Sequence, residues 1–142
     1  MPGTAARKIF VNLPVRDLGA SVALFTALGF EFDARFTDEN AICMVVNDDA
    51  FVMLLVEHRF ADFTTKAICD ATTSTEAIIA LSADSRAQVD DLVHRALAAG
   101  GRPANDPMDY GFMYGWSFQD PDGHLWELVF MEPNATDEPG EG

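Results

Sequence analysis

Residues 119–127 read QDPDGHLWE, and this stretch decides how the last part of the chain folds. Pro121 fixes the φ angle that the second position of a tight turn needs, and Gly123 tolerates a positive φ. The segments on both sides are rich in aromatic and branched residues, as paired strands are. The pattern therefore predicts a hairpin. Its second strand, residues 124–131, is apolar after His124 except for one acidic residue, Glu127.

The first half of the chain shows a strand followed by a helix. Residues 8–15 (KIFVNLPV) predict a strand, Asp17 is suited to cap a helix, and Gly29 is suited to end it. Further strands are expected after this helix, two of them separated by a turn of Asn and Asp residues. The expected strands are residues 30–36, 41–46 and 51–57.

The second half repeats this order of elements. Residues 76–83 predict a strand, Asp84 or Ser85 is suited to cap a helix, and a short strand near 102–104 precedes the hairpin. A repeated order with little sequence identity is typical of a duplicated module. We therefore expect one α+β domain over 1–142, made of two tandem βαβββ modules. Their predicted bounds are 8–57 and 76–132, with a connector at 58–75 and a disordered acidic tail at 133–142.

The charge of the chain argues against some partners. Nine Lys and Arg against 23 Asp and Glu give a net charge of −14, which repels nucleic acid and anionic membrane surfaces. The acidity serves either solubility or the attraction of a cationic ligand. Cys43 and Cys69 follow no metal-binding spacing and are interpreted as free thiols. No stretch has the length of a membrane span or a signal peptide, so a cytoplasmic protein is expected.

Two modules, the opening LPVRDL (13–18) and the closing DPDGHLWEL (120–128) resemble the vicinal oxygen chelate superfamily. It includes glyoxalase I, extradiol dioxygenases, fosfomycin resistance enzymes and bleomycin resistance proteins. The resemblance spans residues 8–132 and implies a curved mixed sheet that forms an open cup. It also implies a homodimer, in which the modules pair within one chain or are exchanged between chains.

The resemblance implies where a metal would bind in the metal-dependent members. The carboxylate of their second module corresponds to Glu127, and the other three ligand positions fall at Phe10, Leu54 and Ile78. A shift by one residue brings in only Asn12 in the first strand, and neither Met53 nor Leu55 restores the third position. Because one carboxylate holds a divalent ion poorly, we expect no metal and no cofactor.

Glu127 is the candidate catalytic or anchoring residue. In apolar surroundings a carboxylate needs a donor, a cation or a ligand to compensate it. It is either a general base or ligand anchor, or a remnant held by Asn12 or a backbone amide. Aromatic residues alternate along DYGFMYGWSFQ, and those with polar groups are expected to line a pocket. The predicted ligand-binding residues are Phe10, Asn12, Leu54, Ile78, Tyr110, Tyr114 and Trp116.

Two classes of function follow from this interpretation. The first is a metal-free protein that binds or sequesters a small molecule in an apolar aromatic-lined cavity, and the acidic balance of the chain suits a cationic molecule. The second is a glyoxalase-like lyase or isomerase, with either atypical metal ligands or Glu127 as general base. The three apolar ligand positions favour the first class. Whether the chain is an enzyme stays open at this point.

Overall fold

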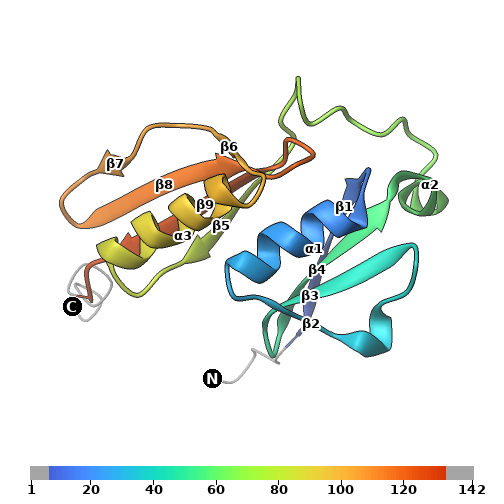
Figure 1. The fold of residues 1–142 in the computed structure, drawn as a ribbon, viewed down its shortest axis with the longest axis horizontal. Coiled ribbons are helices and arrows are strands. Elements are labelled where there is room, and N and C mark those ends of the chain that lie inside the picture. The colour runs from blue at the N-terminus through green and yellow to red at the C-terminus, as the bar shows by residue number, and fades with distance from the viewer. Residues whose placement is uncertain (1–6, 134–142) are drawn as a thin grey trace. The chain divides into compact units, whose positions relative to one another are not determined.

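The computed structural model describes residues 7–133, so the predicted acidic tail lies outside the described residues except for Pro133. The chain divides into two compact units, Met1–Cys69 and Asp70–Gly142. Each unit contains one module with its own sheet (Figure 1). The boundary between the units lies inside the segment that the sequence predicts as the connector. The predicted α+β class with repeated βαβββ modules is confirmed.

The first unit has the element order β-α-β-β-β, followed by a short helical segment. Its four strands have the order β1-β4-β3-β2, with β1 parallel to β4 and the remaining pairs antiparallel. The elements are β1 (Ile9–Val15), α1 (Leu18–Ala27), β2 (Glu31–Phe32), the 3₁₀ turn η1 (Ala34–Phe36), β3 (Ala41–Asn47), β4 (Ala50–Val56), α2 (Glu57–Phe60) and the 3₁₀ turn η2 (Ala61–Phe63).

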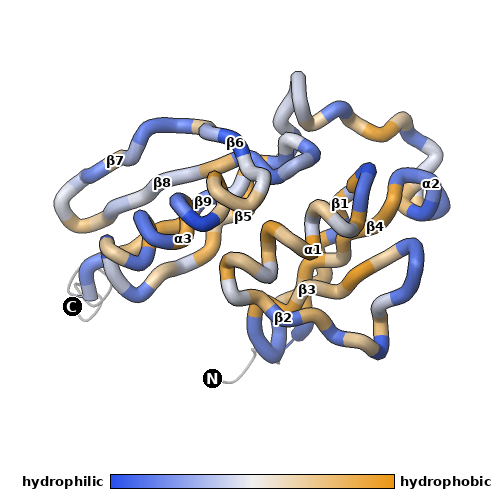
Figure 2. The backbone as a smooth tube through the Cα atoms, in the orientation of Figure 1, coloured by the Kyte–Doolittle hydropathy of each residue, from blue (hydrophilic) through white to orange (hydrophobic). Residues whose placement is uncertain are grey.

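Helix α1 begins and ends where the sequence predicts. The side chain of Asp17 accepts hydrogen bonds from the backbone N–H groups of Gly19 and Ala20, and Gly29 follows the helix with a φ of 95°. Leu24 and Phe25 of α1 are fully buried. Figure 2 shows that apolar residues dominate β3 and β4, the central strands that supply the rest of this core.

The strand predicted over residues 30–36 is wrong in its length. Strand β2 contains only two residues, and the 3₁₀ turn η1 follows it. The side chain of Asp33 accepts hydrogen bonds from the backbone N–H of Arg35 at 3.0 Å and from its guanidinium at 2.7 Å. This local capping competes with strand pairing and turns the chain early.

The second unit repeats the arrangement with one additional strand. Strands β5, β9, β8 and β6 are neighbours in this order, β5 runs parallel to β9, and β7 also pairs with β8. The sequence did not predict β7. The elements are β5 (Ile78–Ser82), α3 (Arg86–Ala98), β6 (Arg102–Pro103), β7 (Met108–Asp109), β8 (Met113–Gln119) and β9 (Leu125–Met131).

Helix α3 covers one face of this second sheet. Ser85 caps the helix by accepting a hydrogen bond from the backbone N–H of Gln88 at 3.0 Å. Val89, Val93 and Ala96 of α3 are fully buried, and on the sheet the buried partners are Phe118, Trp126 and Leu128. Side chains alternate between the two faces along a strand. Glu127 lies between Trp126 and Leu128 on β9, so its side chain is on the face of the sheet opposite α3.

The predicted hairpin of β8 and β9 is confirmed, and a buried carboxylate organises its turn. Asp120 is 1% exposed and accepts hydrogen bonds from the backbone N–H groups of Asp122 (2.9 Å) and His124 (3.0 Å). Its second oxygen accepts the indole N–H of Trp126 at 3.0 Å. The backbone N–H of Gly123, with a φ of 94°, closes the turn onto the Asp120 carbonyl at 2.9 Å. The start of β9, and with it Glu127, is thereby fixed.

Candidate functional site

Glu127 lies on β9, one of the central strands of the second sheet, and its side chain is on the face opposite α3. Its neighbour on β5 is Ala80 and its neighbour on β8 is Ser117. Directly opposite residues on neighbouring strands have their Cβ atoms about 5 Å apart. The side chain of Glu127 is half-buried, so a molecule from solvent can reach it.

The residues next to Glu127 are unusually small. Besides Ala80 and Ser117, a Cβ added to Gly115 on β8 would lie only 3.9 Å from the carboxylate atom Oε2. Larger apolar side chains occupy the positions above and below on the same face. We call this surface the Glu127 face, and its members are Ile78, Ala80, Gly115, Ser117, Leu125, Glu127 and Val129.

The carboxylate of Glu127 has no partner among the described residues of its unit. Within residues 70–133 it accepts no hydrogen bond and forms no ion pair. Half-buried polar groups in proteins are usually paired, because desolvation without a partner costs free energy. The Glu127 face therefore presents one unpaired acceptor in the middle of small and apolar side chains.

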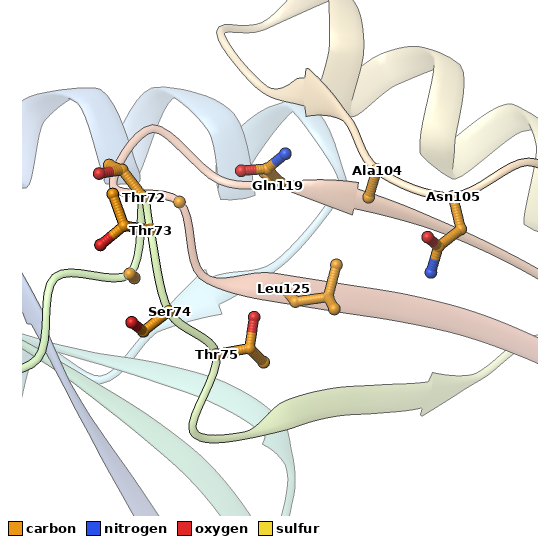
Figure 3. A pocket seen from close by; sticks show the side chains of 10 residues that line it. Thr72, Thr73, Ser74, Thr75, Ala104, Asn105, Gln119 and Leu125 are labelled. Atoms are coloured by element: carbon orange, nitrogen blue, oxygen red, sulfur yellow. The ribbon is translucent and has the colours of Figure 1, made fainter.

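The Ser117 hydroxyl is not available to a ligand at this face. Ser117 is 3% exposed, and its Oγ accepts a hydrogen bond from the backbone N–H of Asn105 at 3.0 Å. This bond attaches the loop after β6 to the centre of the sheet. Beyond it, a pocket of about 290 Å³ opens next to Leu125 (Figure 3).

Ile78 shares the Glu127 face, as the sequence predicts for a residue near the acid. It pairs with Leu125, two residues before Glu127 on β9, and is 58% exposed. The sequence indicates Gly115 as a position that leaves room for a close ligand, but it does not identify Ala80 and Ser117, because small residues carry no motif. Ser117 could have been identified by counting alternate residues along each strand of the hairpin away from the turn, because every second side chain lies on the same face as Glu127.

Phe10 and Asn12 share one face of the first sheet. Phe10 stacks on Phe51 with ring centroids 5.0 Å apart, and the Asn12 amide donates a hydrogen bond to the Phe10 carbonyl at 3.2 Å. Both residues are exposed. In the register of β1 with β4, Phe10 pairs with Phe51, and Asn12 pairs with Met53.

Leu54 does not lie with Phe10. It follows Met53 on β4 and therefore points to the opposite face, where it is fully buried. Leu54 would correspond to Glu127 only if the turns of the two modules had equal lengths. The first hairpin closes with Asn47 opposite Ala50 after an irregularity in β3, whereas the second closes with a longer loop. On β4 it is therefore Met53, and not Leu54, that shares the face of Phe10 and Asn12.

Tyr114 and Trp116 lie on the α3 side of β8, away from Glu127. The Tyr114 hydroxyl donates a hydrogen bond to the carboxylate of Asp90 on α3 at 2.6 Å, and this bond raises the pKa of Tyr114 to about 12. The Trp116 ring meets His94 of α3 edge to face, with centroids 5.1 Å apart. The structure thus brings these two aromatic residues together with the helix and not with the carboxylate.

Tyr110 occupies the tip of the β7–β8 hairpin. It is 58% exposed, and its hydroxyl points to the sulfur atom of Met108 at 3.5 Å. Of the predicted site residues in the second unit, only Ile78 and Glu127 share a face. The walls around the acid are aliphatic, and the aromatic residues of β8 lie elsewhere.

The residues around Glu127 do not fit a divalent metal ion. Such an ion needs several oxygen or nitrogen ligands, and the neighbouring side chains on this face are alkyl groups and a serine hydroxyl that is already hydrogen-bonded. Among residues 7–133, no three His, Cys, Asp or Glu side chains form a group that could hold an ion. We therefore derive no chemical step through a metal.

Comparison with known proteins identifies the family. The model of the Glyoxalase/Bleomycin resistance protein/Dioxygenase superfamily matches residues 9–128. The chain belongs to this superfamily, which confirms the resemblance found in the sequence.

Solved structures agree with this assignment. A hypothetical protein from S. aureus is 25% identical, with 89% of this chain and 95% of that chain covered and a TM-score of 0.75. A glyoxalase-related enzyme from Fulvimarina pelagi is 21% identical, with 89% and 88% covered and a TM-score of 0.76. A bleomycin resistance determinant encoded on the transposon Tn5 is 19% identical, with 88% and 98% covered and a TM-score of 0.60. The last two likenesses show the fold alone.

No curated protein gives a significant match. Within residues 7–133, no helix is both long and apolar enough to cross a membrane.

Proposed function

We propose that this protein binds a small molecule on the Glu127 face without the help of a metal ion. The ligand carries a cationic group, such as an amine, that meets the Glu127 carboxylate. Its apolar part packs on Ile78, Leu125 and Val129. Charge-assisted hydrogen bonds are about twice as strong as neutral ones, so one such contact orients a ligand on an otherwise apolar surface.

The unpaired carboxylate is the observation that carries this proposal. Small residues flank Glu127 on both neighbouring strands, and its carboxylate has no hydrogen-bond partner among residues 70–133. A merely structural acid in this position would be expected to accept a backbone or side-chain hydrogen bond. An acid that receives a ligand needs an open acceptor and room around it.

The charge of the chain supports a cation as the group recognised. With a net charge of −14, the protein attracts cations and slows the approach of anions. Glu127 adds a specific contact to this general field. We propose no catalytic step, because no described group near Glu127 completes an acid–base pair. A homodimer is part of the proposal, with the Glu127 face left accessible.

Thermal unfolding with and without ligand tests the proposal. The panel contains bleomycin and other cationic antibiotics, together with neutral compounds of similar size. A compound that binds only the folded state raises the melting temperature, by an amount that grows with its concentration over Kd. We expect a rise with at least one cationic compound, unchanged when EDTA is present throughout.

Two variants make this experiment specific. Glu127→Gln keeps the shape and removes the charge, and Glu76→Gln removes one exposed charge elsewhere in the same unit. We expect the ligand-induced rise to disappear in the first variant and to remain in the second. Stoichiometric metal in the purified protein, with a response that EDTA abolishes, would contradict the proposal and favour metal-dependent chemistry.

A further inference from the structure

A second feature of the second unit has the properties of a binding site. It is the pocket of about 290 Å³ formed by residues 71–75, the loop after β6 and the ends of β8 and β9. Figure 3 shows side chains from these three segments around one opening. The pocket adjoins the Glu127 face, because it shares Leu125 with that face and Gln119 lies opposite Leu125 on β8, but Glu127 itself is not among its lining residues.

The pocket wall is held in place before any ligand arrives. The Asp70 carboxylate accepts hydrogen bonds from the backbone N–H (2.9 Å) and hydroxyl (2.6 Å) of Thr72. The Asp70 carbonyl accepts the backbone N–H groups of Thr73 and Ser74. On the other side, a Cβ on Gly123 would lie 2.8 Å from the Ala71 carbonyl oxygen, so the segment packs tightly on the β8–β9 turn. A preorganised wall lowers the entropic cost of binding.

The loop after β6 forms the opposite wall and is also fixed. The backbone N–H of Asn105 donates to Ser117 Oγ at 3.0 Å, and the Gln119 amide donates to the Pro103 carbonyl at 3.0 Å. The side chain of Asn105 therefore has a defined starting position at the rim. Leu125 and two alanines supply the apolar part of the lining.

Several polar groups that line this pocket have no hydrogen-bond partner among residues 7–133. Within the described residues, the hydroxyls of Ser74 and Thr75 and the side-chain amide of Asn105 make no hydrogen bond. Gln119 donates its N–H but keeps its carbonyl oxygen free to accept. Hydroxyl and amide groups both donate and accept, so these four side chains match a ligand that does the same.

The pocket contains no charge to balance a charged ligand. None of its ten lining residues is acidic or basic. A phosphate or carboxylate would find no Arg or Lys, and an ammonium would find no carboxylate. The lining fits a neutral molecule with several hydroxyl groups and one apolar patch.

We propose that this pocket binds a neutral, hydroxyl-rich small molecule, of which a monosaccharide is the simplest example. The hydroxyls of Ser74 and Thr75 and the amide of Asn105 hydrogen-bond the sugar hydroxyls, while Leu125 lies against the C–H face of the ring. The volume is near the lower end of the range for small-molecule sites, which suits one sugar ring.

NMR titration of the full-length, ¹⁵N-labelled chain tests this inference. The probes are glucose, mannose and N-acetylglucosamine, with glucose 6-phosphate as the charged counterpart. We expect at least one neutral sugar to cause saturable shifts in the millimolar range at the amides of Thr75, Asn105 and Leu125. The phosphorylated sugar is expected to bind more weakly, because the pocket lacks a cation.

Variants separate this site from the Glu127 face. Thr75→Val and Asn105→Ala each remove a proposed hydrogen bond and are expected to weaken sugar binding about fivefold, the equivalent of one hydrogen bond. Thr26→Val, at an exposed position on α1, is the control and leaves binding unchanged. Glu127→Gln also leaves it unchanged, so failure of the proposed function does not affect this test. No saturable shift with any neutral sugar overturns the inference, and so does sugar binding by Thr75→Val and Asn105→Ala as tight as that of the unaltered protein.

Discussion

Ser117 lies directly opposite Glu127 in the antiparallel pairing of β8 and β9. The hydroxyl of Ser117 is buried and accepts the backbone N–H of Asn105, which lies at the rim of the polar pocket. One small residue therefore serves two surfaces. It leaves the Glu127 carboxylate uncovered on its own face, and it fixes the loop that forms one wall of the pocket.

Ser117→Ala is predicted to lower the free energy of unfolding by about 1–2 kcal/mol, because the N–H of Asn105 loses its partner in a part-buried position. Urea unfolding followed by tryptophan fluorescence measures this change. Ser74→Ala removes an exposed hydroxyl that forms no hydrogen bond with the described residues 7–133, and it should change the free energy of unfolding by less than about 0.5 kcal/mol. Equal stability of the two variants would show that the Ser117 bond is unimportant.

Asp120→Asn is predicted to be more damaging. The carboxylate accepts two backbone N–H groups with one oxygen and the indole N–H of Trp126 with the other. An amide presents an N–H in place of one of these acceptors, so two donors face each other in a buried turn. We expect a loss of about 2–4 kcal/mol, measured by urea unfolding.

The indole of Trp126 provides a spectroscopic signal for the loss of the Asp120 carboxylate. The near-ultraviolet circular dichroism of the protein should change in Asp120→Asn, because the indole N–H loses its hydrogen-bond acceptor. Asp106→Asn, in the exposed loop before β7, is the matched control and should leave both measurements unchanged. A stable Asp120→Asn variant with a native spectrum would contradict the role assigned to this turn.

Gly123→Ala tests the packing of residues 71–75 against the β8–β9 turn. Gly123 has a φ of 94°, and its added Cβ would meet the Ala71 carbonyl at 2.8 Å. Gly111 has a φ of 83° but open space around the same position. Gly111→Ala should therefore cost only the backbone term, about 1–2 kcal/mol. Gly123→Ala should lower the free energy of unfolding, measured by thermal unfolding, by clearly more than Gly111→Ala does. An equal loss of stability in the two variants would disprove the close packing.

Tyr114 gives a prediction about pH. The chain has two tyrosines, so Tyr110→Phe leaves Tyr114 as the only one that titrates. The Asp90 carboxylate raises the pKa of Tyr114 to about 12 in the folded protein, compared with about 10 in model peptides. The stabilisation is fully present below pH 10 and is lost as the pH rises towards 12.

Ultraviolet absorbance of tyrosinate measures this titration directly. In Tyr110→Phe the midpoint should lie well above that of a free tyrosine. Adding Asp90→Asn should bring the midpoint down, because the negative partner is replaced by a neutral one. A midpoint that does not respond to Asp90→Asn would show that the hydrogen bond with Asp90 is not what raises the pKa of Tyr114.

The sequence predicts the fold well where local chemistry decides it. Asp17, Ser85 and Gly29 mark helix ends by their capping groups, and the Pro and Gly of the DPDG turn mark the hairpin. These signals act over a few residues and need no knowledge of packing. The residues 30–36 are predicted less well, because the capping by Asp33 outweighs strand propensity there.

The site is predicted less completely for two physical reasons. A shift of one residue in a strand exchanges its faces, and the different turns of the two modules displace Leu54 in this way. Alternation alone also does not say which face of β8 the helix covers, so Tyr114 and Trp116 were assigned to the pocket side. The polar pocket depends on the path of residues 71–75, which no local pattern encodes.

The most direct test of the proposed function is a calorimetric titration of the cationic compound that most raises the melting temperature. It compares the unaltered protein with Glu127→Gln under identical conditions, in EDTA. We expect saturable binding near one site per chain and a loss in affinity of about tenfold or more in the variant, the size expected for one charge-assisted hydrogen bond. Equal affinity of the two proteins would contradict the claim that the Glu127 carboxylate holds the ligand.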